Sequence, residues 1–489
     1  MTEGSYDWQK FLKKSNVEAV PVTCFKHVSM SKHWGPIKEG MFIEMKSSDC
    51  SECPPHSPCC FWVGVVIKIT GYIGLVRWLG FDEDSSNDFY VNFCTEPHLH
   101  PLGWGAENGM PHVPPKCIED KYSDWKDYLQ KKIKSVPTIS PDFPSRVEES
   151  KKSVIKRGMK LEVVDRNLIS AVRVATVNKV IGGRLYLKYD GLPESDAGFW
   201  CHERSPLIHP IGWSQIVGHA LRGSLEYAKQ SLLKTLFQTH EPADATWEMF
   251  VPVPNPVKNM KFQPQMKLEA IDPLNLSTIC VATVTEVLRN NYLMIGIDGM
   301  TEADGSDCFC YHASSPCIFW PGFCESNDLQ LTPPRGYKGE FKWEDYFKKT
   351  KSKPAPKILF HRDVPNHGFQ EGSFLEAVDL MDPRLICVAQ VTKVVGRLLR
   401  IHFVGWEEAF DQWCDCESPD LYPVGWCDAM GYRLEPPRVV QEPCDSRKIL
   451  KANTKNRRRR ARMAFTVRKR HNVRDFDALS IKTEPVDSS

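Results

Sequence analysis

The sequence lacks long apolar runs. None of its stretches approaches the roughly 20 consecutive apolar residues that a membrane-spanning helix needs. The opening residues, Met1-Thr-Glu-Gly-Ser-Tyr-Asp-Trp8, contain neither the basic segment nor the apolar segment of a secretory signal. We therefore expect a soluble protein in a reducing compartment, with its 18 cysteines as thiols.

Familiar catalytic motifs are also absent. The chain has no Gly-rich phosphate loop, no His-Glu-x-x-His motif and no Gly-x-Ser-x-Gly motif. Scattered Cys, His and Asp residues are expected by chance at this length. We expect a protein that is not an enzyme and that uses no cofactor.

Charge is divided unevenly along the chain. Residues 446–474 hold 13 Lys or Arg and no Asp or Glu, so subtracting 13 from the net charge of +2 leaves −11 for the rest. An acidic body with a basic tail indicates cationic partners for the first and anionic partners for the second.

The chain repeats itself about every 110 residues. Four similar openings, such as Gly158-Met-Lys-Leu-Glu162, place a glutamate at 44, 162, 269 and 376, at spacings of 118, 107 and 107 residues. Each unit closes with a motif such as His209-Pro-Ile-Gly-Trp213 or Tyr422-Pro-Val-Gly-Trp426. The spacing predicts four copies of one domain.

Each unit contains two β-branched runs joined by a short turn, which predicts a hairpin. In unit three these runs are 279–287 and 292–298, and in unit four they are 386–395 and 397–403. Few and short strands favour a compact barrel. Aromatics at helical spacing that begin at Trp8, Trp125 and Trp343 predict short amphipathic arms that pack on a barrel.

Five motifs recur in this order: Trp-x-x-Tyr/Phe-Leu/Phe, Gly-Met-x-Leu-Glu-x-x-Asp, Cys-Val-Ala-x-Val, Phe/Tyr-x-Gly-x and Pro-x-Gly-Trp. Over residues 8 to 437 they resemble the malignant brain tumour (MBT) repeat, in the four-repeat subgroup that includes the like-2 relative of lethal(3) malignant brain tumour. The resemblance implies a mainly β fold of four SH3-like or Tudor-like barrels, each with an N-terminal extended helical arm. It also implies a nuclear role in repressive, Polycomb-like chromatin. The repeats are expected at 8–115, 122–222, 227–334 and 341–437, followed by a disordered basic tail at 438–489.

A methylated lysine is recognised by aromatic faces, because methylation keeps the charge while it adds apolar surface. Mono- and dimethyl-lysine keep an N–H that can bond to a carboxylate, whereas trimethyl-lysine has none. A small aromatic cage that includes one Asp therefore favours the lower methylation states.

Unit four has a residue for every part of the family's cage. The resemblance makes Asp379 the acceptor, makes Phe403, Trp406 and Phe410 the walls, and places Asp382 at the rim. Two residues depart from the family pattern, because Phe410 is commonly Tyr and Val404 is commonly Asp. Losing the Tyr hydroxyl should be tolerated, whereas the sequence does not show what Val404 does.

Aromatics beside a barrel strand are more often core than cage, so the other units serve as an internal control. Each of the other three units lacks some of the cage residues, which indicates that these units serve as structural scaffold. Their residues at the cage positions are Ser47 (with Asp49 nearby), Trp78, Phe81 and Ser85 in unit one, Asp165, Tyr189, Leu192 and Asp196 in unit two, and Asp272, Ile297, Met300 and Asp304 in unit three. Trp413 and Trp426 are assigned to packing, and so are the closing-motif histidines His100 and His209.

Two further features leave alternatives open. Cys50, Cys53, Cys59 and Cys60 form either a zinc site or a loop with free thiols, and the adjacent last pair is poor for tetrahedral ligation. The tail either serves nuclear import and binds DNA or RNA phosphates, or is merely solubilising. Its candidate residues are Arg457, Arg458, Arg459, Arg460, Arg468, Lys469 and Arg470, and Lys482 matches a weak sumoylation pattern.

Two functions remain after this reading. The first is a reader of histone tails that carry mono- or dimethyl-lysine, within a repressive chromatin complex. The second is a non-catalytic scaffold that presents four barrels to other proteins and contacts nucleic acid through the tail.

Overall fold

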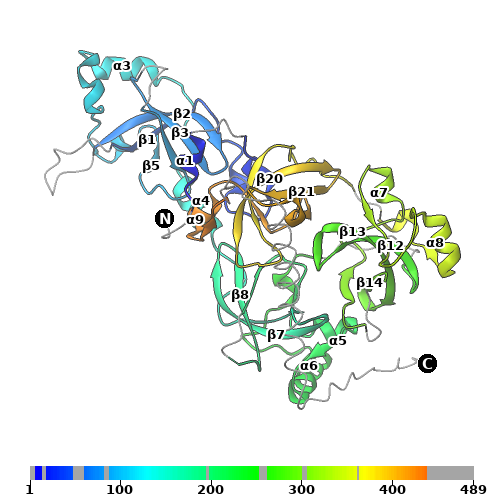
Figure 1. Cartoon of the computed structure of the whole chain (residues 1–489). Coiled ribbons are helices and arrows are strands. Elements are labelled where there is room, and N and C mark those ends of the chain that lie inside the picture. The colour runs from blue at the N-terminus through cyan, green and yellow to red at the C-terminus, as the bar shows by residue number, and fades with distance from the viewer. Residues whose placement is uncertain are drawn as a thin grey trace. The chain divides into compact units, whose positions relative to one another are not determined.

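The computed structural model describes residues 6–13, 18–47, 60–81, 87–193, 198–252, 261–299, 305–360 and 363–437. Within these residues the fold is mainly β and contains four curled sheets, one for each repeat (Figure 1). This confirms the predicted fold class. None of the described helices is long and apolar enough to cross a membrane.

The four sheets share one strand order, in which the long hairpin is central. The first sheet runs β4-β3-β2-β1-β5, with β1 Phe42–Lys46, β2 Phe61–Thr70, β3 Ile73–Trp78, β4 Phe89–Asn92 and β5 Leu99–Pro101. The second runs β10-β6-β7-β8-β9, with β6 Lys160–Asp165, β7 Leu168–Ile181, β8 Arg184–Tyr189, β9 Phe199–His202 and β10 Ile208–His209, and β11 Leu221–Arg222 joins β7.

The remaining two sheets follow the same plan. The third runs β15-β14-β13-β12-β16, with β12 Met266–Asp272, β13 Asn275–Val287, β14 Tyr292–Ile297, β15 Phe309–His312 and β16 Ile318–Phe319, and it adds β17 Leu331–Thr332 and β18 Lys353–Pro354. The fourth runs β22-β21-β20-β19-β23, with β19 Phe374–Val378, β20 Ile386–Val395, β21 Leu398–Phe403, β22 Gln412–Asp415 and β23 Leu421–Tyr422, and β24 Leu434–Glu435 joins β20.

The predicted hairpins form where the sequence places them. Asn290, Asn291 and Gly396 have φ values of 55°, 61° and 56°, the left-handed conformation that Asn and Gly tolerate best in a tight turn. β13 and β20 each contain a buried run of residues, in which Val281, Val284, Val388 and Val391 are at most 1% exposed. The strands therefore follow from local sequence.

The recurring glutamate connects the opening motif of each repeat to its closing motif. In repeat four, Glu376 accepts backbone N–H bonds from Gly425 and Cys427, both at 2.8 Å. The equivalent bonds to Glu44, Glu162 and Glu269 measure 2.6 to 2.9 Å. The carboxylate thus satisfies orphan N–H groups at the start of the short helix that follows the closing motif. These helices are α2 Trp104–Glu107, α5 Trp213–Val217, α7 Phe323–Ser326 and α9 Trp426–Met430.

The predicted arms are helical and pack on barrels. They contain α1 Trp8–Leu12, α3 Trp125–Lys132 and α8 Trp343–Thr350, and α6 Leu225–Phe237 takes the same place after repeat two; α4 Phe143–Ser150 follows the α3 arm. Trp343 Nε1 donates to Glu269 of repeat three at 3.0 Å, and Trp8 Nε1 donates to Glu376 of repeat four at 2.8 Å. An arm therefore packs on the barrel that precedes it in the chain, and the first arm packs on the fourth barrel.

The closing-motif histidines have the predicted structural role. His100 stacks on Trp104 with ring centroids 3.5 Å apart, and His209 stacks on Trp213 at 3.6 Å. The corresponding pairs in repeats three and four are Phe319 with Phe323 and Tyr422 with Trp426. These positions hold flat rings that cover the closing turn.

The chain divides into two compact units. One contains the first and fourth sheets together with Ile181–Arg184 from the β7–β8 hairpin, and the other contains the second and third sheets. Thirteen of the described cysteines are free thiols, but Cys60 is disulfide-bonded, which corrects the expectation that every cysteine is a thiol. Cys50, Cys53 and Cys59 lie outside the described residues, as does the tail.

Candidate functional site

The acceptor predicted for the fourth repeat, Asp379, begins the loop between β19 and β20. Its Oδ1 accepts the backbone N–H of Met381 at 2.9 Å and that of Asp382 at 3.3 Å. The backbone N–H of Leu385 then bonds to the carbonyl of Asp382 at 2.9 Å. Local hydrogen bonds of this kind are typical of Asx turns, and they hold the carboxylate at a fixed place in the loop.

Gln412, the first residue of β22, holds the same loop from its other side. Its amide nitrogen donates to the carbonyl of Val378 at 2.8 Å, and its amide oxygen accepts the N–H of Leu380 at 3.3 Å. Asp379 lies between these two residues, so one buried side chain fixes the backbone on both sides of it. Gln412 is not among the site residues predicted from the sequence.

A signal for Gln412 is nevertheless present in the repeats. Strands β4, β9 and β15 begin with Phe89, Phe199 and Phe309, whereas β22 begins with Gln412. In repeat one, the ring of Phe89 packs on Trp78 with centroids 4.8 Å apart. Only the fourth repeat replaces this ring with a side chain that can hydrogen-bond to the loop.

The three predicted wall residues belong to one short segment. Phe403 ends β21 and is 4% exposed. Trp406 follows in a turn, where its N–H bonds to the carbonyl of Phe403 at 3.0 Å. The rings of Trp406 and Phe410 are half-buried and meet edge to face, with centroids 5.3 Å apart and planes at 69°. Because Gln412 comes two residues after Phe410, this segment and the Asp379 loop are connected.

The rim residue Asp382 forms an ion pair. Both of its oxygens accept hydrogen bonds from Arg384, at 2.8 and 2.7 Å. This pair is at the surface, where such interactions contribute little to stability. A bidentate pair nevertheless orients the Asp382 carboxylate.

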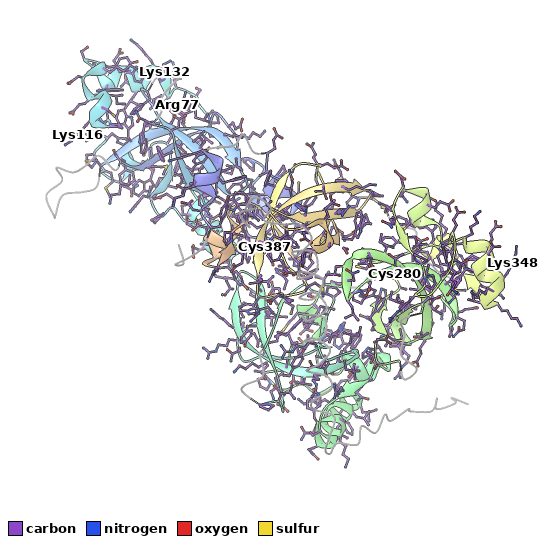
Figure 2. The ribbon with its side chains drawn as sticks, viewed as in Figure 1. Arg77, Lys116, Lys132, Cys280, Lys348 and Cys387 are labelled. Atoms are coloured by element: carbon purple, nitrogen blue, oxygen red, sulfur yellow. The ribbon has the colours of Figure 1, made fainter. Side chains whose placement is uncertain are left out.

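Carboxylates surround the base of the Asp379 loop. Cys387 on β20, labelled in Figure 2, pairs with Glu435 on β24. Burial, followed by the negative charges of Asp379, Glu435 and Asp382, raises the pKa of the Cys387 thiol to about 12. The charged groups that act on this thiol are therefore carboxylates.

Repeat two has the opposite arrangement around its equivalent carboxylate. Asp165 is fully buried and accepts hydrogen bonds from Arg173 at 2.6 Å and from Arg222 at 2.9 Å. Arg173 and Arg222 occupy the strand positions of Cys387 and Glu435, since the two repeats share the same β-pairing. The hydroxyl of Tyr189, at a wall position, donates to the Val164 carbonyl at 2.8 Å. Arg173 and Arg222 thus already occupy the position beside Asp165 that a cationic ligand would need.

Repeat three lacks the walls rather than the acid. Asp272 is buried, and its pKa is raised because burial penalises the charged form. Cys280, labelled in Figure 2, pairs with Thr332, so no second carboxylate occupies the position of Glu435. Ile297 replaces the first ring, and Met300 and Asp304 lie outside the described residues.

Repeat one lacks the acid. Ser47 occupies the acceptor position, and Asp49 and Ser85 lie outside the described residues. Trp78 is buried against Phe89. Asp196 of repeat two is also outside the described residues.

The structure explains the departure at Val404. In repeats two and three the residue at this position is an Asp that pairs with a Lys at the start of the barrel, as in Lys160–Asp190 at 3.0 Å and Lys267–Asp298. In repeat four the Lys position is Phe374, and Phe11 of the first arm packs on it with ring centroids 5.7 Å apart. In repeat four, Val404 replaces the Asp and Phe374 replaces the Lys. Neither charge of the pair is therefore left buried without its partner.

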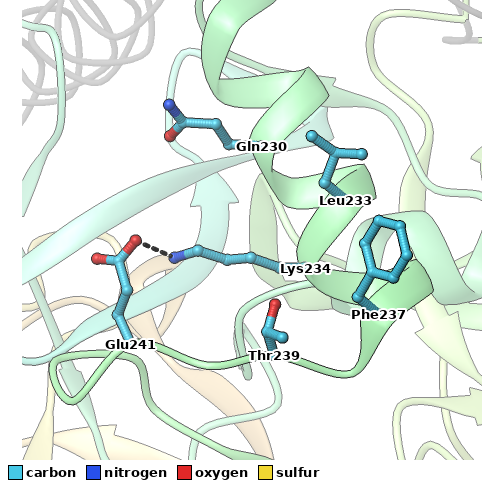
Figure 3. Close-up of a pocket in the computed structure, with 6 residues that line it drawn as sticks. All are labelled: Gln230, Leu233, Lys234, Phe237, Thr239 and Glu241. Atoms are coloured by element: carbon cyan, nitrogen blue, oxygen red, sulfur yellow. Dashed lines mark ion pairs between the residues drawn. The ribbon is translucent and has the colours of Figure 1, made fainter.

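A hollow of about 340 Å³ lies beside α6 and is lined by Gln230, Leu233, Lys234, Phe237, Thr239 and Glu241. Figure 3 shows these six side chains. It contains none of the predicted cage residues. Among the described residues, no group of three or more His, Cys, Asp or Glu side chains could hold a metal ion.

One protein-family model matches the chain in four places. The MBT repeat model matches residues 53–119, 159–228, 266–338 and 373–441. The chain belongs to the MBT repeat family. The first match covers β2 to β5, and each later match covers the core strands of one sheet, so this MBT protein has four repeats, as the sequence predicts.

Relatives of this MBT protein extend the match. MBT domain-containing protein 1 of Xenopus laevis is 51% identical over 439 residues, which is 89% of this chain and 68% of that protein. Polycomb protein Sfmbt of Drosophila melanogaster is 47% identical over 453 residues, which is 90% of this chain and 37% of that protein. A crystal structure of the four MBT repeats of Drosophila Sfmbt, in complex with the peptide RHR(me)KVLR, superposes with a TM-score of 0.83. It is 45% identical and covers 90% of this chain and 100% of that chain.

Proposed function

We propose that this MBT protein is a chromatin-associated histone reader that binds mono- or dimethyl-lysine in its fourth repeat. One observation carries the proposal. Asp379 lies near other carboxylates, and Gln412 connects its loop to the segment that carries the three rings. A carboxylate connected in this way to aromatic faces suits an alkylated ammonium group.

The assigned roles follow from the chemistry of the ligand. The Asp379 carboxylate accepts the N–H that mono- and dimethyl-lysine retain, and Phe403, Trp406 and Phe410 contact the methyl groups. Asp382, oriented by Arg384, attracts the basic residues that flank methylated lysines in histone tails. Trimethyl-lysine lacks the N–H, so its affinity should be lower.

The relatives support the same function. Sfmbt is a Polycomb protein whose four MBT repeats bind a peptide with a methylated lysine. By this likeness the present protein acts in the nucleus, in transcriptional repression, and it binds methylated histone tails and the proteins of a repressive complex. A binding role of this kind requires no catalysis, so we propose that it is not an enzyme.

The remaining sequence predictions are part of this proposal. The repeats occupy 8–115, 122–222, 227–334 and 341–437, and the basic tail occupies 438–489. The tail serves nuclear import through two clusters, Arg457–Arg460 and Arg468–Arg470, and Lys482 is a candidate for sumoylation. All three lie outside the described residues.

Titration of histone peptides with zero, one, two or three methyl groups on one lysine tests the reader function. One side chain in one pocket buries little area, so we expect micromolar or weaker binding, strongest for the mono- and dimethyl peptides. Asp379→Asn should weaken that binding about tenfold or more, because a hydrogen bond to a charged group contributes about 1.5–3 kcal/mol. The matched control, Asp272→Asn at the same position in repeat three, should leave it unchanged. Equal binding of methylated and unmethylated peptides by the native protein would favour the scaffold function instead.

A further inference from the structure

A strip of lysines lies on the arm of the third repeat. The strip comprises Lys348 and Lys349 in the last turn of α8, Lys351 at its C-cap, Lys353 in β18 and Lys357 in the 3₁₀ turn Lys357–Phe360. All five side chains are exposed. No Asp or Glu occurs between Asp345 and Asp363, so the strip is a local exception in a body that carries a net −11 outside the tail segment.

Within the part of the chain that the structure describes, none of these five lysines forms an ion pair. The ring contacts that two of them make, Lys357 over Trp320 at 4.4 Å and Lys349 over Tyr337 at 5.4 Å, neutralise no charge. Lys348, labelled in Figure 2, extends away from its sheet at the outer edge of α8. Five positive charges are therefore available to an external anion.

Helix stabilisation accounts for only part of this strip. Lysines in the last turn of a helix favour its dipole, which explains Lys348 and Lys349. The effect falls off within that turn, so it does not explain Lys351, Lys353 or Lys357. The α3 arm provides a contrast, because there Lys131 pairs with Asp127 at 2.5 Å.

We infer that this lysine strip, Lys348 to Lys357, binds the phosphate backbone of duplex DNA. Closely spaced exposed cations of this kind suit the closely spaced phosphates of a DNA duplex. Lysine ammonium groups bind phosphates as point charges and read no base sequence. The DNA contact would thus be non-specific, as suits a protein whose specificity comes from another site.

The inference goes beyond the reader function and does not depend on it. Peptide binding is placed on the fourth sheet, in one compact unit, whereas the strip lies in the other unit, on the arm that packs on the third barrel. Loss of either activity alone is therefore measurable, and failure of one leaves the other standing.

The test compares two full-length variants of equal charge. One carries Lys348→Gln, Lys349→Gln, Lys351→Gln and Lys353→Gln. The matched control carries Lys126→Gln, Lys131→Gln, Lys132→Gln and Lys134→Gln on the arm that contains α3. These four lysines are also exposed. Binding to a 30-base-pair duplex is measured by fluorescence anisotropy at several salt concentrations, with circular dichroism to confirm that both variants fold.

We expect the strip variant to bind DNA about tenfold more weakly or worse, with the slope of log K against log salt reduced by about 3 to 4. The control should change the slope much less, and methylated-peptide binding should be the same in both variants. Equal losses in the two variants would show that net charge alone matters and would overturn the inference. So would an unchanged strip variant, or a strip that binds phosphatidylserine vesicles or single-stranded RNA in preference to duplex DNA.

Discussion

Arg173 Nε lies 2.6 Å from Asp165 Oδ2, and this pair occupies the positions that Cys387 and Asp379 occupy in the fourth repeat. The same backbone frame thus places Arg173 beside the carboxylate in repeat two and Cys387 at the equivalent position in repeat four. The residue at this position, Arg173 on β7 or Cys387 on β20, therefore determines whether an arginine of the neighbouring strand bonds to the carboxylate.

Cys387→Arg should therefore convert repeat four to the state of repeat two. The new guanidinium would bond to Asp379, as Arg173 bonds to Asp165, and methylated-peptide binding should fall below detection. Isothermal titration calorimetry with a dimethyl-lysine peptide checks this. Cys280→Arg, at the matched position of repeat three, is the control and should bind normally. Full affinity in Cys387→Arg would contradict the proposed role of Asp379.

Gln412→Phe should remove binding while keeping the barrel. Phe is the residue that begins β4, β9 and β15, so the sheet accommodates it there. The Val378 carbonyl and the Leu380 N–H would lose their partner, and the Asp379 loop would lose its second support. We expect peptide affinity to drop about tenfold, since an unsatisfied buried polar group costs about 1–3 kcal/mol.

The control for this change is Gln390→Leu, which removes only the exposed amide bond to the Gly372 carbonyl. Its affinity should match the native protein. If Gln412→Phe binds as well as the native protein does, the loop needs no support from β22.

Arg184 should be essential for the stability of the first and fourth repeats. It is fully buried, donates to the Pro383 carbonyl in the Asp379 loop and to the Tyr422 hydroxyl, and lies 3.7 Å from Asp420. Removing one partner of a buried ion pair costs about 3–5 kcal/mol. We expect Arg184→Met to lower the melting temperature and to increase hydrogen exchange of residues 379–385.

The double variant Arg184→Met with Asp420→Asn separates charge from packing. It should recover part of the lost stability, because the buried carboxylate no longer lacks its partner. Equal stability of the single and double variants would show that Asp420 does not depend on Arg184.

Much of this architecture follows from sequence because it rests on local chemistry. The four glutamates, the closing glycines and the hairpin turns act within single repeats, so a comparison of the chain with itself finds them. His100 and His209 were assigned to packing on the same grounds, and both stack on the expected tryptophans. The wall residues of repeat four also form one short segment, although the cage itself remains a proposal.

Interactions between distant segments could not be predicted in this way. Val404 has meaning only beside Phe374 and Phe11, which are far from it in the chain. Arg184 comes from the β7–β8 hairpin and acts in the unit that contains repeat four, and no motif marks it. Arg173 replaces the Cys of the Cys-Val-Ala motif, a visible substitution whose effect depends on the pairing of β6 with β7. In each case the partner is fixed by the fold and not by spacing.

The histidines of repeat two should make that repeat sensitive to acid. Burial lowers the pKa of His209 from 6.5 to about 3 and that of His219 from 6.5 to about 4. The folded state therefore resists protonation, whereas the unfolded chain takes up a proton on each near pH 6.5. The stability that neutral histidines provide is present above this pH and is lost as the pH falls from about 6.5 toward 4. Each histidine contributes a slope of about 1.4 kcal/mol per pH unit in that window.

His209→Phe should remove one of the two histidine contributions to this dependence. Burial raises the pKa of Glu162, in the same repeat, to about 7, so its proton uptake in the folded state opposes the histidines in both proteins. Phe is found at the equivalent position of repeat three, where Phe319 stacks on Phe323, so the ring contact with Trp213 should survive. Hydrogen exchange of the β6 and β10 amides at pH 7, 6 and 5, corrected for the intrinsic rate, measures the opening free energy of repeat two. A variant that loses protection on acidification as steeply as the native protein would show that His209 does not titrate on unfolding. A variant that loses protection more steeply than the native protein would reverse the predicted sign for His209.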